Sequence, residues 1–125
     1  MINHVSIGVR DIARAKAFYD ATLEPLGYAC LSADETSAGY GKHTVALWVM
    51  ASASPVPADP RSGLHFCFTA PTRRSVDAFH EAALAAGGRD NGKPGLRAEY
   101  GANYYAAFAI DPDGYRIEAY CDGRA

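Results

Sequence analysis

Hydrophobic and polar residues alternate in several short stretches of this chain. Residues 2–8 and 64–69 show the pattern most clearly, and it predicts strands because successive side chains on a strand point to opposite faces. Val5 and Ile7 then share one face, and His4 and Ser6 share the other. Further strands are expected over residues 28–31, 39–40, 44–50, 104–110 and 115–121.

Apolar residues recur at helical spacing in two longer stretches, residues 12–24 and 73–86. Asp11 and Thr72 precede them and have side chains suited to cap a helix N-terminus. In the second helix the residues expected to be buried are Val76, Phe79, Ala83 and Leu84.

The two parts of the chain align without a gap at an offset of 61 residues. His4 matches His65, Phe18 matches Phe79 and Gly27 matches Gly88. Internal repeats of this kind indicate two copies of one structural unit. Each copy has the order strand, helix, strand, strand, strand.

The repeat predicts an α+β protein made of paired βαβββ modules, whose curved mixed sheet surrounds a central cleft. Module one covers residues 1–50, and module two covers residues 63–125. Residues 51–62 are rich in proline, alanine and serine and are interpreted as the linker. The three segments form a single domain.

The symmetry fails near the end of each module. Aligning the last strands places Leu47 opposite Glu118, and 118 − 47 is 71 rather than 61, so module two has gained ten residues. The gain is assigned to a glycine-rich loop over residues 90–103, which carries Lys93, Arg97, Glu99 and Tyr100. Loops that depart from a repeat are suitable places for substrate contacts.

Composition and charge exclude some classes of partner. The chain has 125 residues, a formal net charge of −2 and a pI near 6.0, which gives no reason to expect nucleic acid or an anionic membrane. No apolar run approaches the roughly 20 residues needed to cross a bilayer. Cys30, Cys67 and Cys121 are few and widely spaced, so we expect no disulfide framework and a cytoplasmic location.

Two histidines and a late glutamate form the main chemical hypothesis. His4 and His65 occupy equivalent positions in the repeat, and Glu118 has the parity to join them on the face opposite the large apolar residues. Two imidazoles and one carboxylate leave open positions on a divalent ion, where a substrate can bind. Iron(II) and manganese(II) suit this set, and zinc(II) and nickel(II) remain alternatives.

Other residues are assigned to the cleft or excluded from it. His43 is expected to be solvated, His80 is expected in a helix-surface or packing role, and Trp48 is expected to face the helix. Glu99 and Tyr100 are candidates for proton transfer. The candidates for substrate binding are Ser6, Leu47, Cys67, Lys93, Arg97, Tyr105 and Tyr120.

The beginning and end of the chain resemble the vicinal oxygen chelate superfamily. The matching motifs are NHVSIGVRD at residues 3–11, AFY at 17–19, LGY at 26–28, His65 and DPDGYRIE at 111–118. That superfamily includes glyoxalase I, bleomycin-resistance proteins, extradiol dioxygenases and fosfomycin-resistance thiol transferases. The resemblance implies paired βαβββ modules, a divalent metal in the cleft and a homodimer.

Carried over by position, the family's metal ligands fall on His4, His65 and Glu118. Glyoxalase I enzymes have a fourth ligand on the fourth strand, where this alignment has Leu47, which cannot bind metal. The resemblance therefore implies a metal-dependent enzyme other than an ordinary glyoxalase I: a lyase or isomerase, a dioxygenase or a thiol transferase acting on a small oxygen-chelating substrate. The alternative is a bleomycin-resistance-type protein that sequesters an aromatic or cationic ligand without chemistry.

Overall fold

Two four-stranded sheets and two helices make up the computed structural model, which describes residues 1–124. The helices are α1 (Ile12–Leu23) and α2 (Arg73–Ala85). The first sheet has the order β1 (Val5–Val9), β4 (Val45–Ala51), β3 (Ser37–Gly41), β2 (Ala29–Ala33). The second has the order β5 (His65–Thr69), β8 (Arg116–Cys121), β7 (Tyr105–Ile110), β6 (Arg89–Leu96). The expected α+β fold of paired βαβββ modules is confirmed.

Both sheets are mixed and follow the same plan. The first strand of each module pairs in parallel with the last, and the other pairs are antiparallel. β1 and β5 are consequently edge strands of their own sheets. Short 3₁₀ helices at Glu24–Leu26 and Pro60–Ser62 interrupt the connections.

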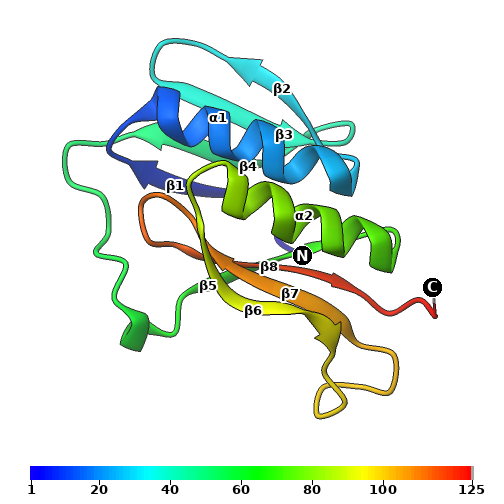
Figure 1. The fold of residues 1–125 in the computed structure, drawn as a ribbon. Coiled ribbons are helices and arrows are strands. Elements are labelled where there is room, and N and C mark those ends of the chain that lie inside the picture. The colour runs from blue at the N-terminus through cyan, green and yellow to red at the C-terminus, as the bar shows by residue number, and fades with distance from the viewer. Residues whose placement is uncertain (125) are drawn as a thin grey trace.

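The helices begin at the capping residues that the sequence indicates. The Asp11 side chain accepts from the Arg14 amide at 3.1 Å, and Thr72 forms a capping box with Ser75. Figure 1 shows α1 and α2 side by side between the two sheets. Leu84, which was expected in the core, is 43% exposed, so its prediction is wrong.

A single hydrophobic core joins the two modules, because residues from both belong to one packed cluster. Phe18 and Tyr19 of α1 and Phe79 of α2 are fully buried in it. The side of each sheet that packs on the helices is called the inner face, and the opposite side the outer face. In Figure 1, no helix or strand formed by residues 1–124 packs across the outer faces.

The turn between β7 and β8 ties module two to module one. The Gly114 amide donates to the Asp111 carbonyl at 2.9 Å, which closes the expected four-residue turn. The Arg10 amide donates to Asp113 Oδ1 at 3.0 Å, and the Tyr115 hydroxyl donates to the Gly8 carbonyl at 2.7 Å. The conspicuous motifs at the two ends of the chain are therefore in contact.

The region expected to be a long loop contains a strand. Arg89–Leu96 forms β6, an irregular strand with two register shifts, and only the segment after it is a loop. Gly92 lies opposite Phe108 at a φ of +153°, and a Cβ there would come within 2.8 Å of the phenyl ring. The glycines of β6 thus leave room for the Phe108 ring to lie on that strand. Because glycine has no side chain, β6 lacks the alternation of apolar and polar residues that identifies the other strands.

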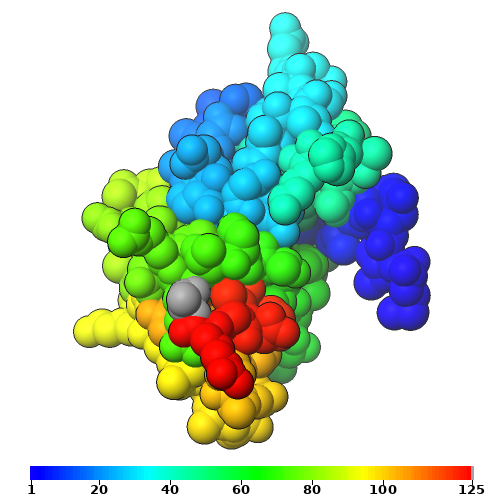
Figure 2. Space-filling view, turned by 90° about the vertical axis from the view of Figure 1, so that its right-hand side faces the viewer, coloured from blue at the N-terminus to red at the C-terminus, as the bar shows by residue number. Residues whose placement is uncertain are grey.

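Within residues 1–124, neither helix has the length and apolar character that crossing a bilayer requires. The N-terminal residues project from the body of the molecule, as the blue spheres of Figure 2 show.

Candidate functional site

His65 and Glu118 are in direct contact on the outer face of the second sheet. The His65 Nε2 atom lies 2.8 Å from Glu118 Oε1. Strand pairing explains the contact, because Cys67 lies opposite Glu118 and His65 is two residues before it on the same face of β5. The Glu118 side chain is 4% exposed and that of His65 is 45% exposed. A buried carboxylate is therefore in contact with an imidazole that solvent can reach.

Tyr104 provides the second hydrogen-bond partner of the Glu118 carboxylate. Its hydroxyl donates to Oε2 at 2.5 Å, so each carboxylate oxygen has one partner. Burial, followed by the hydrogen bond to Glu118, raises the pKa of Tyr104 above its ordinary value, which keeps the phenol protonated. Sequence reasoning missed this residue, because it precedes β7 and its direction depends on how the preceding loop closes.

An aromatic row continues from Tyr104 along the outer face. The Tyr104 and Tyr120 ring centroids lie 4.2 Å apart, and the exposed Tyr100 ring meets Tyr104 edge-on at 5.3 Å. The expectation that Tyr120 points to this face is confirmed by its pairing with Ala106 and Thr69.

Tyr105 points the other way, and the prediction that it faces the cleft is wrong. It lies opposite Cys121, a core residue, and its hydroxyl donates to Asp77 of α2 at 2.6 Å. Adjacent strand residues have opposite directions, so Tyr104 and Tyr105 cannot share a face while both are extended. Because the two residues are identical, the sequence has no apolar–polar contrast that shows which tyrosine points to the outer face.

Cys67 lies beside Glu118 on the edge strand. Burial first, and the neighbouring Glu118 charge second, raise the pKa of the Cys67 thiol to about 12. The thiol is therefore protonated at neutral pH and does not act as a ready thiolate.

His4 lies outside β1, which begins at Val5. Its imidazole is exposed, and its Nδ1 atom is 2.7 Å from the side-chain oxygen of Asn3. Within residues 1–124, no three histidine, cysteine, aspartate or glutamate side chains come together as a metal site. The chain thus brings together His65 and Glu118, and leaves His4 apart from them.

The structural counterpart of Glu118 is Trp48 rather than Leu47. Ser6 pairs with Trp48 in module one as Cys67 pairs with Glu118 in module two. Leu47 belongs to the core at 5% exposure, so the prediction that it lies on the outer face is wrong: the last strands of the two modules align one residue further along. Trp48 lies on the outer face with Ser6, contrary to the expectation that it faces the helix. Neither Leu47 nor Trp48 has a carboxylate, so module one has no chemical equivalent of Glu118.

The residues expected in the loop over residues 90–103 differ in their relation to the site, and Lys93 lies within β6 rather than in a loop. The Arg97 guanidinium lies over the Phe108 ring at 5.4 Å and donates to the Lys93 carbonyl at 2.6 Å. Phe108 pairs with Glu118, so Arg97 borders the site. The Lys93 and Glu99 side chains are exposed, and the Glu99 carboxylate makes no hydrogen bond or ion pair with the described residues.

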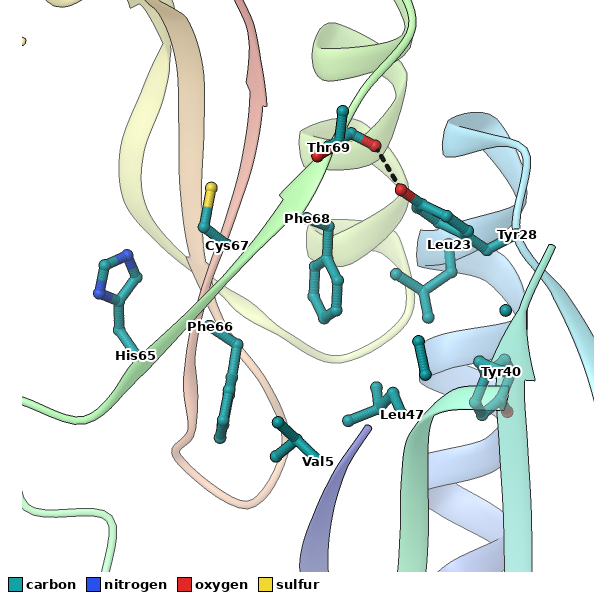
Figure 3. Close-up of a pocket in the computed structure, with 12 residues that line it drawn as sticks. Val5, Leu23, Tyr28, Tyr40, Leu47, His65, Phe66, Cys67, Phe68 and Thr69 are labelled. Carbon is teal, nitrogen blue, oxygen red and sulfur yellow. Dashed lines mark hydrogen bonds between the residues drawn. The ribbon is translucent and has the colours of Figure 1, made fainter. Parts of the chain in front are cut away.

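Two cavities meet at His65. The larger, of about 360 Å³, lies between β5 and module one; its apolar wall includes Val5, Leu47, Phe66 and Phe68, which Figure 3 shows turned toward one another. His65 and Cys67 lie on the other side of β5 in that view. The smaller, of about 200 Å³, is lined by Gly63, His65, Asn91, Phe108 and Arg116.

Residues 1–119 match the profile of the Glyoxalase/Bleomycin resistance protein/Dioxygenase superfamily. No curated relative matches the chain. Among solved structures, a glyoxalase/bleomycin resistance protein from Albidiferax ferrireducens T118 is similar with a TM-score of 0.82 and 31% identity, over 94% of this chain and 95% of that one.

More distant structures share the fold. A glyoxalase-related enzyme from Fulvimarina pelagi has a TM-score of 0.74 and 18% identity, over 96% of this chain and 86% of that one. A glyoxalase I variant from Zea mays has a TM-score of 0.69 and 19% identity, over 95% of this chain and 45% of that one.

Proposed function

Because the chain belongs to the Glyoxalase/Bleomycin resistance protein/Dioxygenase superfamily, we propose that it is an enzyme that uses a divalent metal ion. The observation that carries the proposal is the contact of 2.8 Å between His65 Nε2 and Glu118 Oε1. The Glu118 carboxylate is almost fully buried, and its Oε1 atom faces the partly exposed His65 imidazole. A buried carboxylate beside an accessible histidine is a suitable pair of metal ligands.

The donor atoms fit a transition metal ion. One imidazole nitrogen and one carboxylate oxygen suit iron(II), manganese(II), zinc(II) or nickel(II). We assign the third ligand to His4 of a second copy of the chain, in a homodimer. Two features support this assignment: the His4 imidazole is exposed, and both sheets have an uncovered outer face.

When bound, the ion acts as a Lewis acid on a substrate that chelates it through two neighbouring oxygens. Tyr104 holds Glu118 Oε2, so the carboxylate is oriented with Oε1 toward His65. The absence of a carboxylate at Trp48 argues against the two-carboxylate chemistry of glyoxalase I. The reaction classes that remain are a lyase or isomerase step, a dioxygenation or a thiol transfer.

Metal analysis of protein purified without chelator tests the proposal. The wild type is expected to carry metal, and His65→Ala and His4→Ala are expected to lose most of it. His43→Ala is the matched control, because His43 is also exposed but lies in the turn before β4. Equal metal content in wild type and His65→Ala would contradict the proposal.

A second candidate function is ligand sequestration without catalysis. It gains support from Trp48, which lies on the outer face rather than against the helix, and from the largely apolar cavity of about 360 Å³. Trp48 is the only tryptophan, so its fluorescence reports directly on that face. Tight binding of an aromatic ligand to metal-free protein, with a fluorescence change, would favour this function over the enzyme.

A further inference from the structure

The smaller cavity contains an arginine that has no acidic partner. Arg116 lies on β8 directly opposite His65, and both line the cavity of about 200 Å³. The Arg116 side chain makes no ion pair or hydrogen bond with any residue in the range 1–124. An unpaired guanidinium in a cavity is a ready-made donor for a planar anion.

The nearby carboxylates are already engaged elsewhere. Glu118 is two residues from Arg116 on the same face, but its oxygens are bound by His65 and Tyr104. Asp59 pairs with Arg61 at 3.0 Å, and those contacts lower its pKa more than Arg116 does. Neither group therefore neutralises Arg116 by direct contact.

The rest of the cavity wall suits the same kind of ligand. Asn91 contributes an amide, and Phe108 contributes an aromatic surface with the Arg97 guanidinium on it. Arg89 lies opposite Ile110 in the row that contains Arg116 and His65. These cations gather on one face although the chain as a whole has a net charge of −2.

We propose that this cavity, defined by His65, Asn91, Phe108 and Arg116, binds a carboxylate of the substrate. The proposal rests on the proposed function and narrows its substrate class to small acids. In such a substrate, two neighbouring oxygens would chelate the ion that His65 and Glu118 hold under the proposed function, and a further carboxylate, a few bonds away, pairs with Arg116. Because Arg116 and His65 are adjacent on neighbouring strands, one small molecule can span both groups.

A pair of probe ligands isolates the effect of the carboxylate. 2-Oxoglutarate and 2-oxopentanoate have the same chelating end, and only the first has a distal carboxylate. Calorimetric titration of the wild type is expected to give a dissociation constant about tenfold lower for 2-oxoglutarate, as one charge-assisted hydrogen-bonded pair provides. Arg116→Gln is expected to abolish that preference, Arg116→Lys to retain part of it, and Arg74→Gln, on the exposed side of α2, to leave it unchanged.

Titrations with and without added metal separate this proposal from the preceding one. A preference for 2-oxoglutarate that depends on Arg116 would support the carboxylate subsite, whether it is measured with or without added metal. Equal affinities for the two probes, no binding of either, or a preference that survives Arg116→Gln would overturn the subsite. Metal content measured on each variant shows which of the two proposals has failed.

Discussion

The Tyr19 hydroxyl donates a hydrogen bond of 2.5 Å to Asp111 Oδ2 inside the core, joining α1 of module one to the β7–β8 turn of module two. Both residues are almost fully buried, at 0% and 3% exposure. The other Asp111 oxygen accepts from the amides of Asp113 and Tyr115, so the carboxylate organises the turn and attaches it to the helix.

Tyr19→Phe is expected to lower the free energy of unfolding by about 1–3 kcal/mol, because it leaves Asp111 Oδ2 buried without a donor. Chemical denaturation measures the change. Tyr28→Phe is the control, since the Tyr28 hydroxyl also bonds across the modules, to the Thr69 carbonyl at 2.8 Å, but is partly exposed. A loss for Tyr19→Phe no larger than that for Tyr28→Phe would show that the buried carboxylate has found another partner.

The same carboxylate gives stability a dependence on pH. Burial raises the pKa of Asp111, and it outweighs the hydrogen bonds from Tyr19 and the backbone, which lower it. The native state therefore holds the Asp111 proton more tightly than the unfolded state, whose pKa is about 3.9. The stability that this proton contributes is fully present below about pH 4 and is lost as the pH rises through the native pKa.

Asp111→Asn removes this titration while keeping a side chain of the same shape. The difference in unfolding free energy, wild type minus Asp111→Asn, is expected to decrease as the pH rises from about 4 through the native pKa of Asp111. Denaturation at a series of pH values measures it. A difference that increases over that interval would mean that the folded protein favours the ionised form.

Tyr104→Phe is expected to weaken metal binding about tenfold, the usual effect of losing a partner that orients a metal ligand. Only the hydroxyl that holds Glu118 Oε2 is removed, and the ring can still stack on Tyr120. Competition with a chromophoric chelator measures the affinity. Tyr120→Phe is the matched control on the same face, and identical losses in the two variants would contradict a specific role for Tyr104.

Gly39→Ala is expected to displace the Trp48 indole, because a Cβ at residue 39 would lie 2.8 Å from its Cζ3 atom. The crowding is expected to cost about 1–3 kcal/mol and to shift tryptophan emission. Gly101→Ala is the comparison, since the nearest side-chain atom there is the Tyr104 Cβ at 3.7 Å. Unchanged emission in Gly39→Ala would mean that the indole does not rest on β3.

The helices and the His65–Glu118 pair were within reach of sequence reasoning. Asp11 and Thr72 cap their helices through contacts within one turn, so nearby residues suffice to predict them. On β5 the alternation of Phe66 and Phe68 with His65 and Cys67 is clear, and it correctly predicts which side chains leave the core. Glu118 is the only acidic residue within β8.

Where both faces of a strand carry large apolar or aromatic residues, the sequence leaves the direction open. β4 reads Leu47, Trp48, Val49, and β7 follows Tyr104 with Tyr105, so neither contains the polar contrast that marks an outer face. Strand register then decides, and a slip of one residue reverses every side chain. For this reason Leu47 and Tyr105 were assigned to the wrong face.

The sequence by itself determined the two βαβββ modules, their caps and turn, and the parity of His65, because each depends on residues close together in the chain. Only the tertiary structure decided that Trp48 is the counterpart of Glu118, that Tyr104 holds the carboxylate and that Arg116 lacks an acidic partner. These relationships join residues on different strands, so they depend on register and on loop closure rather than on local pattern.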